Sequence, residues 1–133
     1  MSSCIFCGII AGEVPSRKVY EDSDFLAFLD IFPANPGHTL VIPKTHLQDI
    51  HEMSAIEYGE LASRAKIVAD LLADKLNAEG MTIFQMNKEA GWQTVFHAHM
   101  HVIPRFKGDA LHQPWVIRKA SEEELDSIAS KLG

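Results

Sequence analysis

The stretch HAHMHVIPR, residues 97–105, carries a histidine at every second position. In an extended strand successive side chains point to opposite faces, so His97, His99 and His101 share one face while Ala98 and Met100 share the other. The spacing therefore predicts a strand with one apolar face and one row of titratable rings. Such a row can bind a metal ion, transfer protons, attack an electrophile or lie on a solvated strand, and the rest of the chain has to decide between these.

The segments on either side of this stretch predict the other elements. Runs rich in β-branched and aromatic residues, broken by turn residues, predict strands at residues 17–22, 25–30, 37–44 and 81–87, with the histidine strand at residues 93–105. Ser54 and Glu57 form a capping-box pattern, followed by apolar residues at helical spacing as far as Leu76, and Gly80 is expected to end that helix.

Two shorter helices complete the expected architecture. Residues 4–12 predict a short apolar helix or turn, and Ser121 with Glu124 repeats the capping pattern before a short C-terminal helix. Because one long helix is inserted between strands, no alternating βαβ series forms. The prediction is an α+β fold with about five antiparallel strands, one long helix and a short C-terminal helix.

Composition bounds the class of protein. A chain of 133 residues that is 47% apolar can bury one core, which predicts a single domain over residues 1–133. The net charge of -6 and the lack of a Lys/Arg stripe argue against nucleic acid as a partner. No run approaches the roughly 20 apolar residues of a membrane span, and no secretory signal is seen, so a cytoplasmic protein with no membrane partner is expected.

The two cysteines form a C-x-x-C pair at Cys4 and Cys7. A redox pair normally follows a strand and opens a helix within a βαβ unit, whereas no strand precedes this one. Thiol–disulfide chemistry is thus the weaker interpretation, and two unliganded thiols remain an alternative.

A three-histidine metal site is the first alternative for the histidine row. Rings at every second position span roughly 13 Å from first to last at the usual strand rise, so the three cannot easily meet one ion. Three of seven histidines on one strand face still favour a functional site over a solvated strand.

The histidine strand and the segment over residues 25–46 resemble a known family. HAHMHVIPR resembles the histidine triad signature, His-φ-His-φ-His-φ-φ with φ apolar, of the HIT superfamily of nucleotide hydrolases and transferases. FLAFLDIFPANPGHTLVIPKTH, residues 25–46, resembles the first half of the same domain, and the similarity runs from residue 4 to residue 109. The resemblance implies a HIT-like fold. The Hint-like branch is the nearest: small homodimeric enzymes that bind purine nucleotides and hydrolyse nucleoside phosphoramidates.

The resemblance also implies roles for particular residues. His99 would attack the α-phosphorus to form a nucleotidyl-histidine intermediate, with His101 and His38 flanking the phosphate. Asp30 would contact the ribose. The remaining phosphate contacts would come from Asn87, Gln93 and Thr94, and the slot for an AMP-type base from Phe6, Phe28 and Ile31, with Ile5 and Ile9 near its rim.

The same resemblance implies a role for the two cysteines. In relatives with C-x-x-C, positions matching Cys4, Cys7, His46 and His97 bind a structural zinc ion. The resemblance implies no organic cofactor.

The loop NKEAGWQTV, residues 87–95, departs from the usual family loop, because Glu89 stands near an expected glycine and Trp92 lies between Gly91 and Gln93. Three alternatives stay open: a dinucleoside polyphosphate hydrolase, a catalytically weak nucleotide-binding or zinc-stabilised interaction module, and a redox protein.

Overall fold

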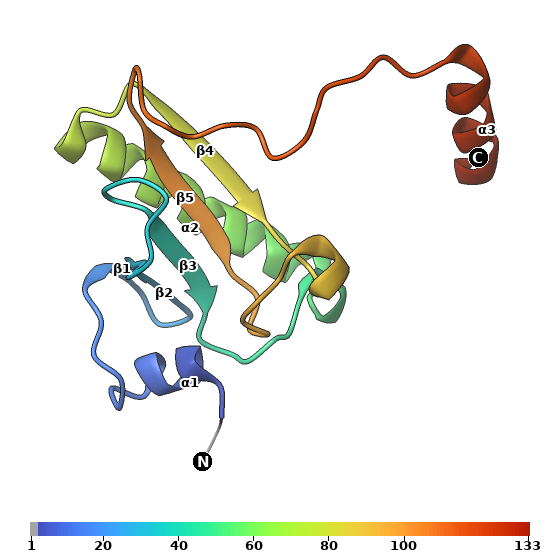
Figure 1. Cartoon of the computed structure of the whole chain (residues 1–133). Helices are drawn as coiled ribbons and strands as arrows, with labels where there is room; N and C mark the ends of the chain where they lie inside the picture. Colours follow the sequence, from blue (N-terminus) through green and yellow to red (C-terminus); the bar gives the residue numbers. More distant parts are fainter. Residues whose placement is uncertain (1–2) are drawn as a thin grey trace.

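The computed structural model describes residues 3–133 and contains one five-stranded antiparallel sheet in the order β1-β2-β3-β5-β4 (Figure 1). Its strands are β1 (Lys18–Glu21), β2 (Phe25–Leu29), β3 (Thr39–Pro43), β4 (Gly80–Gln85) and β5 (Met100–Arg105). The helices are α1 (Ile5–Ile10), α2 (Ala55–Leu76) and α3 (Glu122–Leu132), with short 3₁₀ turns η1 (Ile50–Glu52) and η2 (Glu89–Gly91). The predicted α+β class with five antiparallel strands is confirmed.

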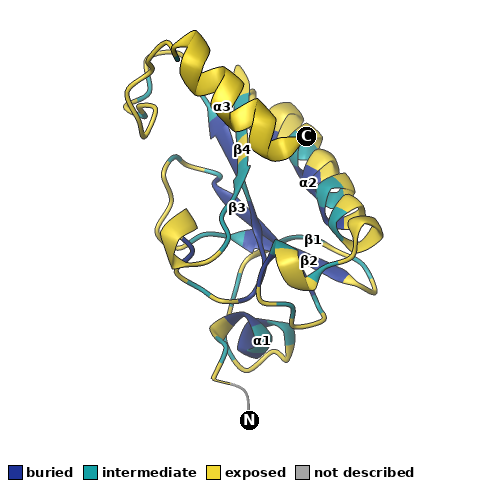
Figure 2. Ribbon diagram, turned by 90° about the vertical axis from the view of Figure 1, so that its right-hand side faces the viewer, coloured by how far each residue is buried: buried dark blue, intermediate teal, exposed yellow. Residues whose placement is uncertain are grey.

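Both faces of the sheet are covered, as the burial colours of Figure 2 show. Helix α2 lies along one face, and α1 packs against the other (Figure 1). Strand β2 is buried on both sides for this reason, which explains its continuous apolar sequence FLAFL. The cluster on the α2 side comprises Phe25, Ala27, Val41, Leu61, Ala65, Val68, Leu72, Met100 and Val102. The opposite cluster comprises Phe6, Ile9, Leu26, Phe28, Leu40 and Ile42.

The predicted strand over residues 93–105 is wrong in its first half. Strand β5 begins only at Met100. Before that point the backbone leaves the ladder, because the N–H of Ala98 donates to the carbonyl of Leu47 at 2.7 Å instead of to a neighbouring strand. The alternation survives, since Met100 and Val102 join the cluster beneath α2 while His101 occupies the other face.

Helix α2 begins as predicted and ends earlier. The Ser54 side chain accepts a hydrogen bond from the N–H of Glu57, and the Glu57 carboxylate accepts one from the N–H of Ser54. The helix stops at Leu76, because Asn77 takes the left-handed conformation with φ 55° and ψ 41°. Gly80, expected to end the helix, instead opens β4.

Helix α3 stands at the end of an extended arm, away from the sheet (Figure 1). Ser121 caps it as predicted by accepting from the N–H of Glu124. The Glu124 carboxylate pairs with Arg118, so the second half of the expected capping box is replaced by an ion pair. Within residues 3–133, no helix is long and apolar enough to cross a bilayer, and the cytoplasmic location stays a prediction.

Candidate functional site

Three histidines meet on the sheet face opposite α2. His38 immediately precedes β3, His99 immediately precedes β5 and His101 lies within β5. Ring centroids lie 4.9 Å apart for His99 and His101, and 5.1 Å apart for His38 and His101. The structure thus brings together the three residues expected around a phosphate.

A directed chain of hydrogen bonds fixes the tautomers of His38 and His101. The backbone N–H of Ala34 donates to Nδ1 of His38 at 2.9 Å, so the neutral His38 ring carries its proton on Nε2. That Nε2–H donates to Nδ1 of His101 at 2.9 Å, which leaves the proton of His101 on its own Nε2. This Nε2 is buried and has no hydrogen-bond partner within residues 3–133. A buried donor without an acceptor suits an anionic ligand oxygen.

His99 has the opposite tautomer. Its Nδ1 lies 2.7 Å from the carbonyl oxygen of His97, and because a carbonyl can only accept, Nδ1 donates. The lone pair of the neutral ring is therefore on Nε2. One ring with an available lone pair thus lies beside another ring with an unpartnered N–H.

Burial keeps these rings neutral. It lowers the pKa of His101 to about 3, and the neighbouring His99 and His38 act in the same direction. Burial also lowers the pKa of His38, although the carboxylate of Asp30 acts against it. The pKa of His99 is lowered by burial too, against the opposing effects of its carbonyl contact and of Asp30. A neutral imidazole is the form that can attack phosphorus.

Asp30 lies where β2 ends, partly exposed. Its Oδ1 accepts from the N–H of Phe32 at 2.8 Å, and its Oδ2 lies 3.6 Å from Nε2 of His38. One carboxylate or ring-nitrogen atom each from Asp30, His38 and His101 lies within 4.8 Å of the other two. Within this group, Nε2 of His38 and Nδ1 of His101 are joined by a hydrogen bond.

Apolar side chains wall the site on the α1 side. Phe6 touches Phe28 and His99 edge-on, with ring centroids 5.4 Å and 5.1 Å apart. Phe6, Phe28 and Ile9 are buried in the core. Ile5 and Ile31 remain 51% and 74% exposed, so of the expected base slot these two have most surface left for a ligand.

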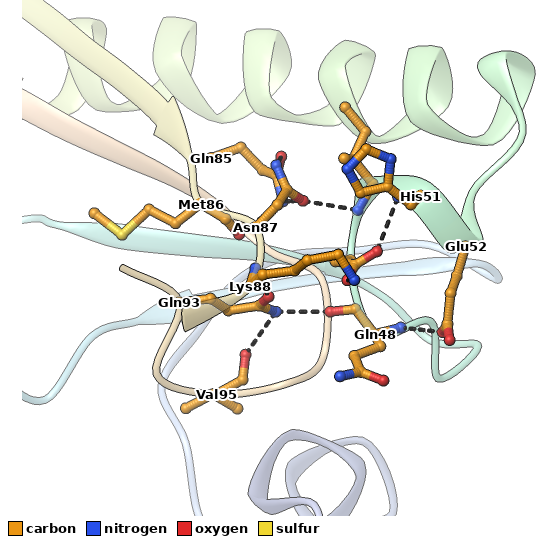
Figure 3. A network of polar contacts seen from close by, with 11 residues as sticks. Gln48, His51, Glu52, Gln85, Met86, Asn87, Lys88, Gln93 and Val95 are labelled. Atoms are coloured by element: carbon orange, nitrogen blue, oxygen red, sulfur yellow. Dashed lines mark hydrogen bonds and ion pairs between the residues drawn. The ribbon is translucent and has the colours of Figure 1, made fainter. Parts of the chain in front are cut away.

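The expected phosphate-loop amides hold the loop itself together (Figure 3). The Gln93 amide donates to the carbonyls of Gln48 and Val95, and its Oε1 accepts from the N–H of Lys88. Asn87 is bonded to the side chain of Gln85 and to the backbone N–H of Ile50. Thr94 is exposed on the same loop.

Two residues of this loop have positive φ: Lys88 with φ 65° and Trp92 with φ 73°. Glycine normally occupies such positions, so the loop departs from ordinary backbone preferences at Lys88 and at Trp92, the second of the two residues that set its sequence apart from the family loop. The ammonium of Lys88 lies 3.2 Å from the carboxylate of Asp49. Burial alone would raise the pKa of Asp49, but Lys88 and the N–H of His51 lower it overall.

A second cluster joins Cys4, Cys7, His46 and His97, whose ligand atoms all lie within 4.8 Å of one another. Nε2 of His97 donates to the carbonyl of Pro43 at 2.7 Å, which leaves its Nδ1 unprotonated and facing the cluster. That Nδ1 lies 3.2 Å from Nδ1 of His46, 3.5 Å from the sulfur of Cys4 and 3.6 Å from that of Cys7.

These separations fit a tetrahedral ion. Usual zinc bond lengths separate two nitrogen ligands by about 3.3 Å, and a nitrogen from a sulfur by about 3.6 Å. Two thiols and two imidazoles are also the ligands of a closed structural zinc site. The cluster can therefore hold a metal ion, and the arrangement separates the ring of His97 from those of His38, His99 and His101.

Several contributors to the site have no recognisable signal in the sequence. Phe84 of β4 stacks on the ring of His101 with centroids 4.5 Å apart and an interplanar angle of 20°. Only the register of β4 against β5, which pairs Phe84 with His101, could have indicated it. The main-chain groups of Ala34, Pro43 and His97 that fix the tautomers leave no signal in a sequence, because every residue has them.

Comparison with known proteins identifies the family. A family model described as HIT domain matches residues 11–108. The crystal structure of SMU.412c from Streptococcus mutans UA159 is similar, with a TM-score of 0.92 and 43% identity, over 99% of this chain and 84% of that one. A Zn-bound histidine triad family protein from Mycobacterium smegmatis has a TM-score of 0.80 and 38% identity, over 98% and 95% of the two chains.

A relative with a named activity also matches. Adenylylsulfatase HINT3 from Arabidopsis thaliana is 34% identical over 131 residues, which cover 98% of this chain and 66% of that protein. With a family model spanning most of its length and these relatives aligned across nearly all of it, the chain belongs to the HIT family.

Proposed function

We propose that this HIT protein is a Hint-like hydrolase that cleaves the bond between the α-phosphorus and nitrogen in purine nucleoside phosphoramidates. The observation that carries the proposal is the complementary protonation of two adjacent rings. His99 has a lone pair on Nε2, and His101 has an unpartnered donor on Nε2. A nucleophile beside a donor for developing negative charge suits displacement at a phosphoryl group.

The reaction would proceed in two displacements. Nε2 of His99 forms a bond to phosphorus while the phosphorus–nitrogen bond breaks, and the departing amine takes a proton from solvent. Water then attacks the nucleotidyl-histidine, its oxygen bonds to phosphorus, one proton is released and the bond to His99 breaks. Nε2–H of His101 donates to the phosphoryl group in both steps, and the carbonyl of His97 keeps Nδ1 of His99 protonated.

The base of the substrate would lie against the apolar wall on the α1 side. Ile31 and Ile5, with Phe6, Phe28 and Ile9 behind them, would contact the base, and Asp30 would bind the ribose. Thr94 would contact the phosphate, while Asn87 and Gln93 would act mainly by holding the loop in shape, as their hydrogen bonds suggest. The Arabidopsis relative is an adenylylsulfatase, which supports chemistry at an adenylyl phosphorus.

Zinc is the proposed metal at Cys4, Cys7, His46 and His97. When bound there, the ion would be structural, since four protein ligands leave no open position for substrate. The donor set and the Zn-bound Mycobacterium smegmatis relative support this assignment. A homodimer, with α2 and β4 as candidate contact elements, completes the proposal.

The test compares wild type with His99→Ala on adenosine 5′-phosphoramidate and on a diadenosine polyphosphate, with released AMP quantified. Wild type should cleave the phosphoramidate faster, and His99→Ala should be inactive. Acid-quenched wild type should carry one nucleotidyl group on His99 by mass spectrometry. His51→Ala, a change at an exposed histidine of η1, is the matched control and should keep its rate.

Each contrary result points to a named alternative. Faster cleavage of the polyphosphate would identify a dinucleoside polyphosphate hydrolase. AMP binding without turnover of either compound would identify a nucleotide-binding module. An exposed Glu89 within the loop of residues 87–95 favours the phosphoramidate, because a carboxylate repels a polyphosphate tail.

A further inference from the structure

The hydrogen bond that sets the tautomers of His38 and His101 begins on an exposed loop. Its donor is the backbone N–H of Ala34, which bonds to Nδ1 of His38 at 2.9 Å. Ala34 lies in the connection between β2 and β3, where residues 31–34 and residue 36 are all exposed. Exposed connections are usually among the more mobile parts of a fold. A tautomer that depends on this N–H therefore depends on the contacts that fix the loop.

Asn35 provides the side chain that ties this loop to the rest of the fold. It is half-buried, and it is the one polar side chain in the stretch IFPANPG, residues 31–37. Its Nδ2 donates to the backbone carbonyl of Pro104 at 3.1 Å and to Oδ2 of Asp109 at 2.9 Å. Both hydrogens of the amide thus bind the end of β5 and the turn that follows it.

Asp109 is itself held in place by several donors. Its Oδ2 accepts from Nε of Arg105 at 2.8 Å and from the N–H of Phe106 at 3.0 Å, and its Oδ1 accepts from Nη2 of Arg105 at 2.7 Å. The guanidinium of Arg105 and the N–H of Phe106 hold the pKa of the Asp109 carboxyl well below its usual value. Asn35 therefore donates to an ionised and fixed acceptor, which gives a stronger hydrogen bond than a neutral one.

The loop also approaches β5 closely at Gly37. Gly37 has φ 92°, and a Cβ at this position would lie 2.9 Å from Cγ of Pro104 and 2.5 Å from Cδ1 of Leu76. Only glycine allows this approach without a shift of its neighbours. The approach brings the loop against the residue whose carbonyl accepts from Asn35.

The backbone of Asn35 continues these contacts to His38. The carbonyl of Asn35 accepts from the N–H of His38 at 3.0 Å. Asn35 thus joins Asp109, through its side chain, to His38, through its main chain. Because Ala34 directly precedes Asn35, the same contacts restrict the direction of the N–H that bonds to Nδ1 of His38.

The alternative protonation of the two rings would remove the donor from the site. If the N–H of Ala34 turned away, the neutral ring of His38 could carry its proton on Nδ1 and accept at Nε2. The hydrogen bond of 2.9 Å between His38 and His101 would then reverse, with Nδ1 of His101 donating. Nε2 of His101 would be left with a lone pair, which repels an anionic phosphoryl oxygen.

We propose that Asn35, anchored on Asp109, is a positioning residue that keeps the proton of His101 on Nε2. It acts through the N–H of Ala34 and the ring of His38. Its contribution to the reaction rests on the proposed phosphoramidase function, whereas its effect on the protonation of the rings does not.

Two substitutions remove the donor of Asn35. Asn35→Ala removes the whole amide, whereas Asn35→Asp keeps its size and places a second carboxylate beside that of Asp109. The near-isosteric Asn35→Asp carries the test if Asn35→Ala fails to fold. The control is Thr82→Val, because the Thr82 hydroxyl accepts from Nη1 of Arg105 at 3.1 Å. That change loosens the same cluster at Arg105 and leaves the amide of Asn35 in place.

Long-range ¹H–¹⁵N NMR spectra at about pH 7.5 show which nitrogen of each neutral ring is protonated. Wild type and Thr82→Val should have the proton of His101 on Nε2, whereas both Asn35 variants should share it between the two ring nitrogens. On adenosine 5′-phosphoramidate their kcat should be about tenfold lower, part of the roughly 10²–10³-fold that complete loss of a transition-state donor costs. KM should stay within about twofold of wild type, since the interaction is lost in the transition state.

Wild-type protonation of His101 in both Asn35 variants would overturn the inference, and so would an equal shift of the proton in Thr82→Val. A fall in kcat without a shift of the proton, or a shift with an unchanged kcat, would overturn it as well. Failure of wild type to cleave the phosphoramidate would overturn the proposed function alone, because the spectra need no turnover and would still decide the role of Asn35.

Discussion

At the residue scale, the chemistry of the site depends on which nitrogen of each histidine carries the proton. The three histidines that the sequence singled out, His38, His99 and His101, do meet in the structure, while their roles stay a prediction. The sequence could not predict their tautomers, since these follow from the backbone N–H of Ala34 and the carbonyl of His97, which only the folded chain brings into place. The lone pair on Nε2 of His99 and the proton on Nε2 of His101 are therefore set by tertiary contacts.

The low pKa of His101 makes stability depend on pH. The pKa is about 3 in the folded chain and about 6.5 in an unfolded one, so the unfolded state binds more protons between these values. The stabilisation is fully present above about pH 6.5 and is lost as the pH falls toward 3. The lowered pKa of His38 acts in the same direction.

Urea unfolding at pH 7.5 and pH 5 measures this effect. We expect the free energy of unfolding to fall by on the order of 1–2 kcal/mol on account of His101. His101→Gln should lose less stability over this range than wild type, and His51→Gln should behave as wild type. Equal losses in wild type and His101→Gln would show that His101 is not the group responsible.

At the element scale, the segments whose ends are set by local hydrogen bonds were predicted well. Ser54 and Glu57 started α2 where the capping box indicated. The errors lie where tertiary contacts compete with local pattern. Residues 93–99 have strand-like alternation, but Ala98 bonds to Leu47, and Asn77 ends α2 ahead of Gly80.

The cap of α2 gives a direct test of that local control. Ser54→Ala leaves the N–H of Glu57 without its side-chain acceptor and should lower the free energy of unfolding by about 1 kcal/mol. Ser63→Ala is the comparison, because Ser63 lies inside the same helix and bonds to the carbonyl of Glu60. There alanine should be neutral or slightly stabilising, since it has the higher helix propensity. Chemical denaturation of both variants provides the measurement, and similar losses would argue against the capping role.

Helix α1 carries two of the four residues of the proposed zinc site, so its position is expected to depend on the metal. Cys4 caps the helix and Cys7 lies within it, and Phe6 between them touches His99. In a Cys4→Ser, Cys7→Ser double variant we expect loss of zinc, a thermal midpoint lower by about 5 °C or more, and weaker AMP binding because Phe6 is released.

Elemental analysis, calorimetry and nucleotide titration follow the three effects. His51→Ala should retain one equivalent of zinc and the wild-type midpoint. Wild type purified without chelator that contains less than a tenth of an equivalent of zinc would contradict the metal assignment.

At the scale of the whole molecule, the sheet leaves β4 at one edge. Ile83 on this edge is 42% exposed, although it is large and apolar. An unpaired edge strand with an exposed apolar residue is suited to pairing with another chain. The proposed homodimer would use this edge, in keeping with the family resemblance that first indicated it.

Sedimentation equilibrium tests the assembly. Wild type should have the mass of two chains, and Ile83→Lys should have the mass of one, because a buried lysine charge is costly. Leu125→Lys changes an exposed residue of α3 and should remain a dimer. Dissociation of Leu125→Lys together with an intact Ile83→Lys dimer would move the contact from β4 to α3.

His97 makes two separate contacts in this structure. Its ring faces Cys4, Cys7 and His46, and its main-chain carbonyl accepts a hydrogen bond from Nδ1 of His99. A substitution at position 97 affects the ring and the main-chain carbonyl differently. Any amino-acid substitution at position 97 removes the imidazole, yet every amino acid supplies the same main-chain carbonyl. A single substitution can therefore remove one ligand of the proposed zinc site, but it can weaken the hydrogen bond to Nδ1 of His99 only indirectly, by moving the backbone. A relative without the proposed zinc site would still keep the acceptor that orients the ring of His99.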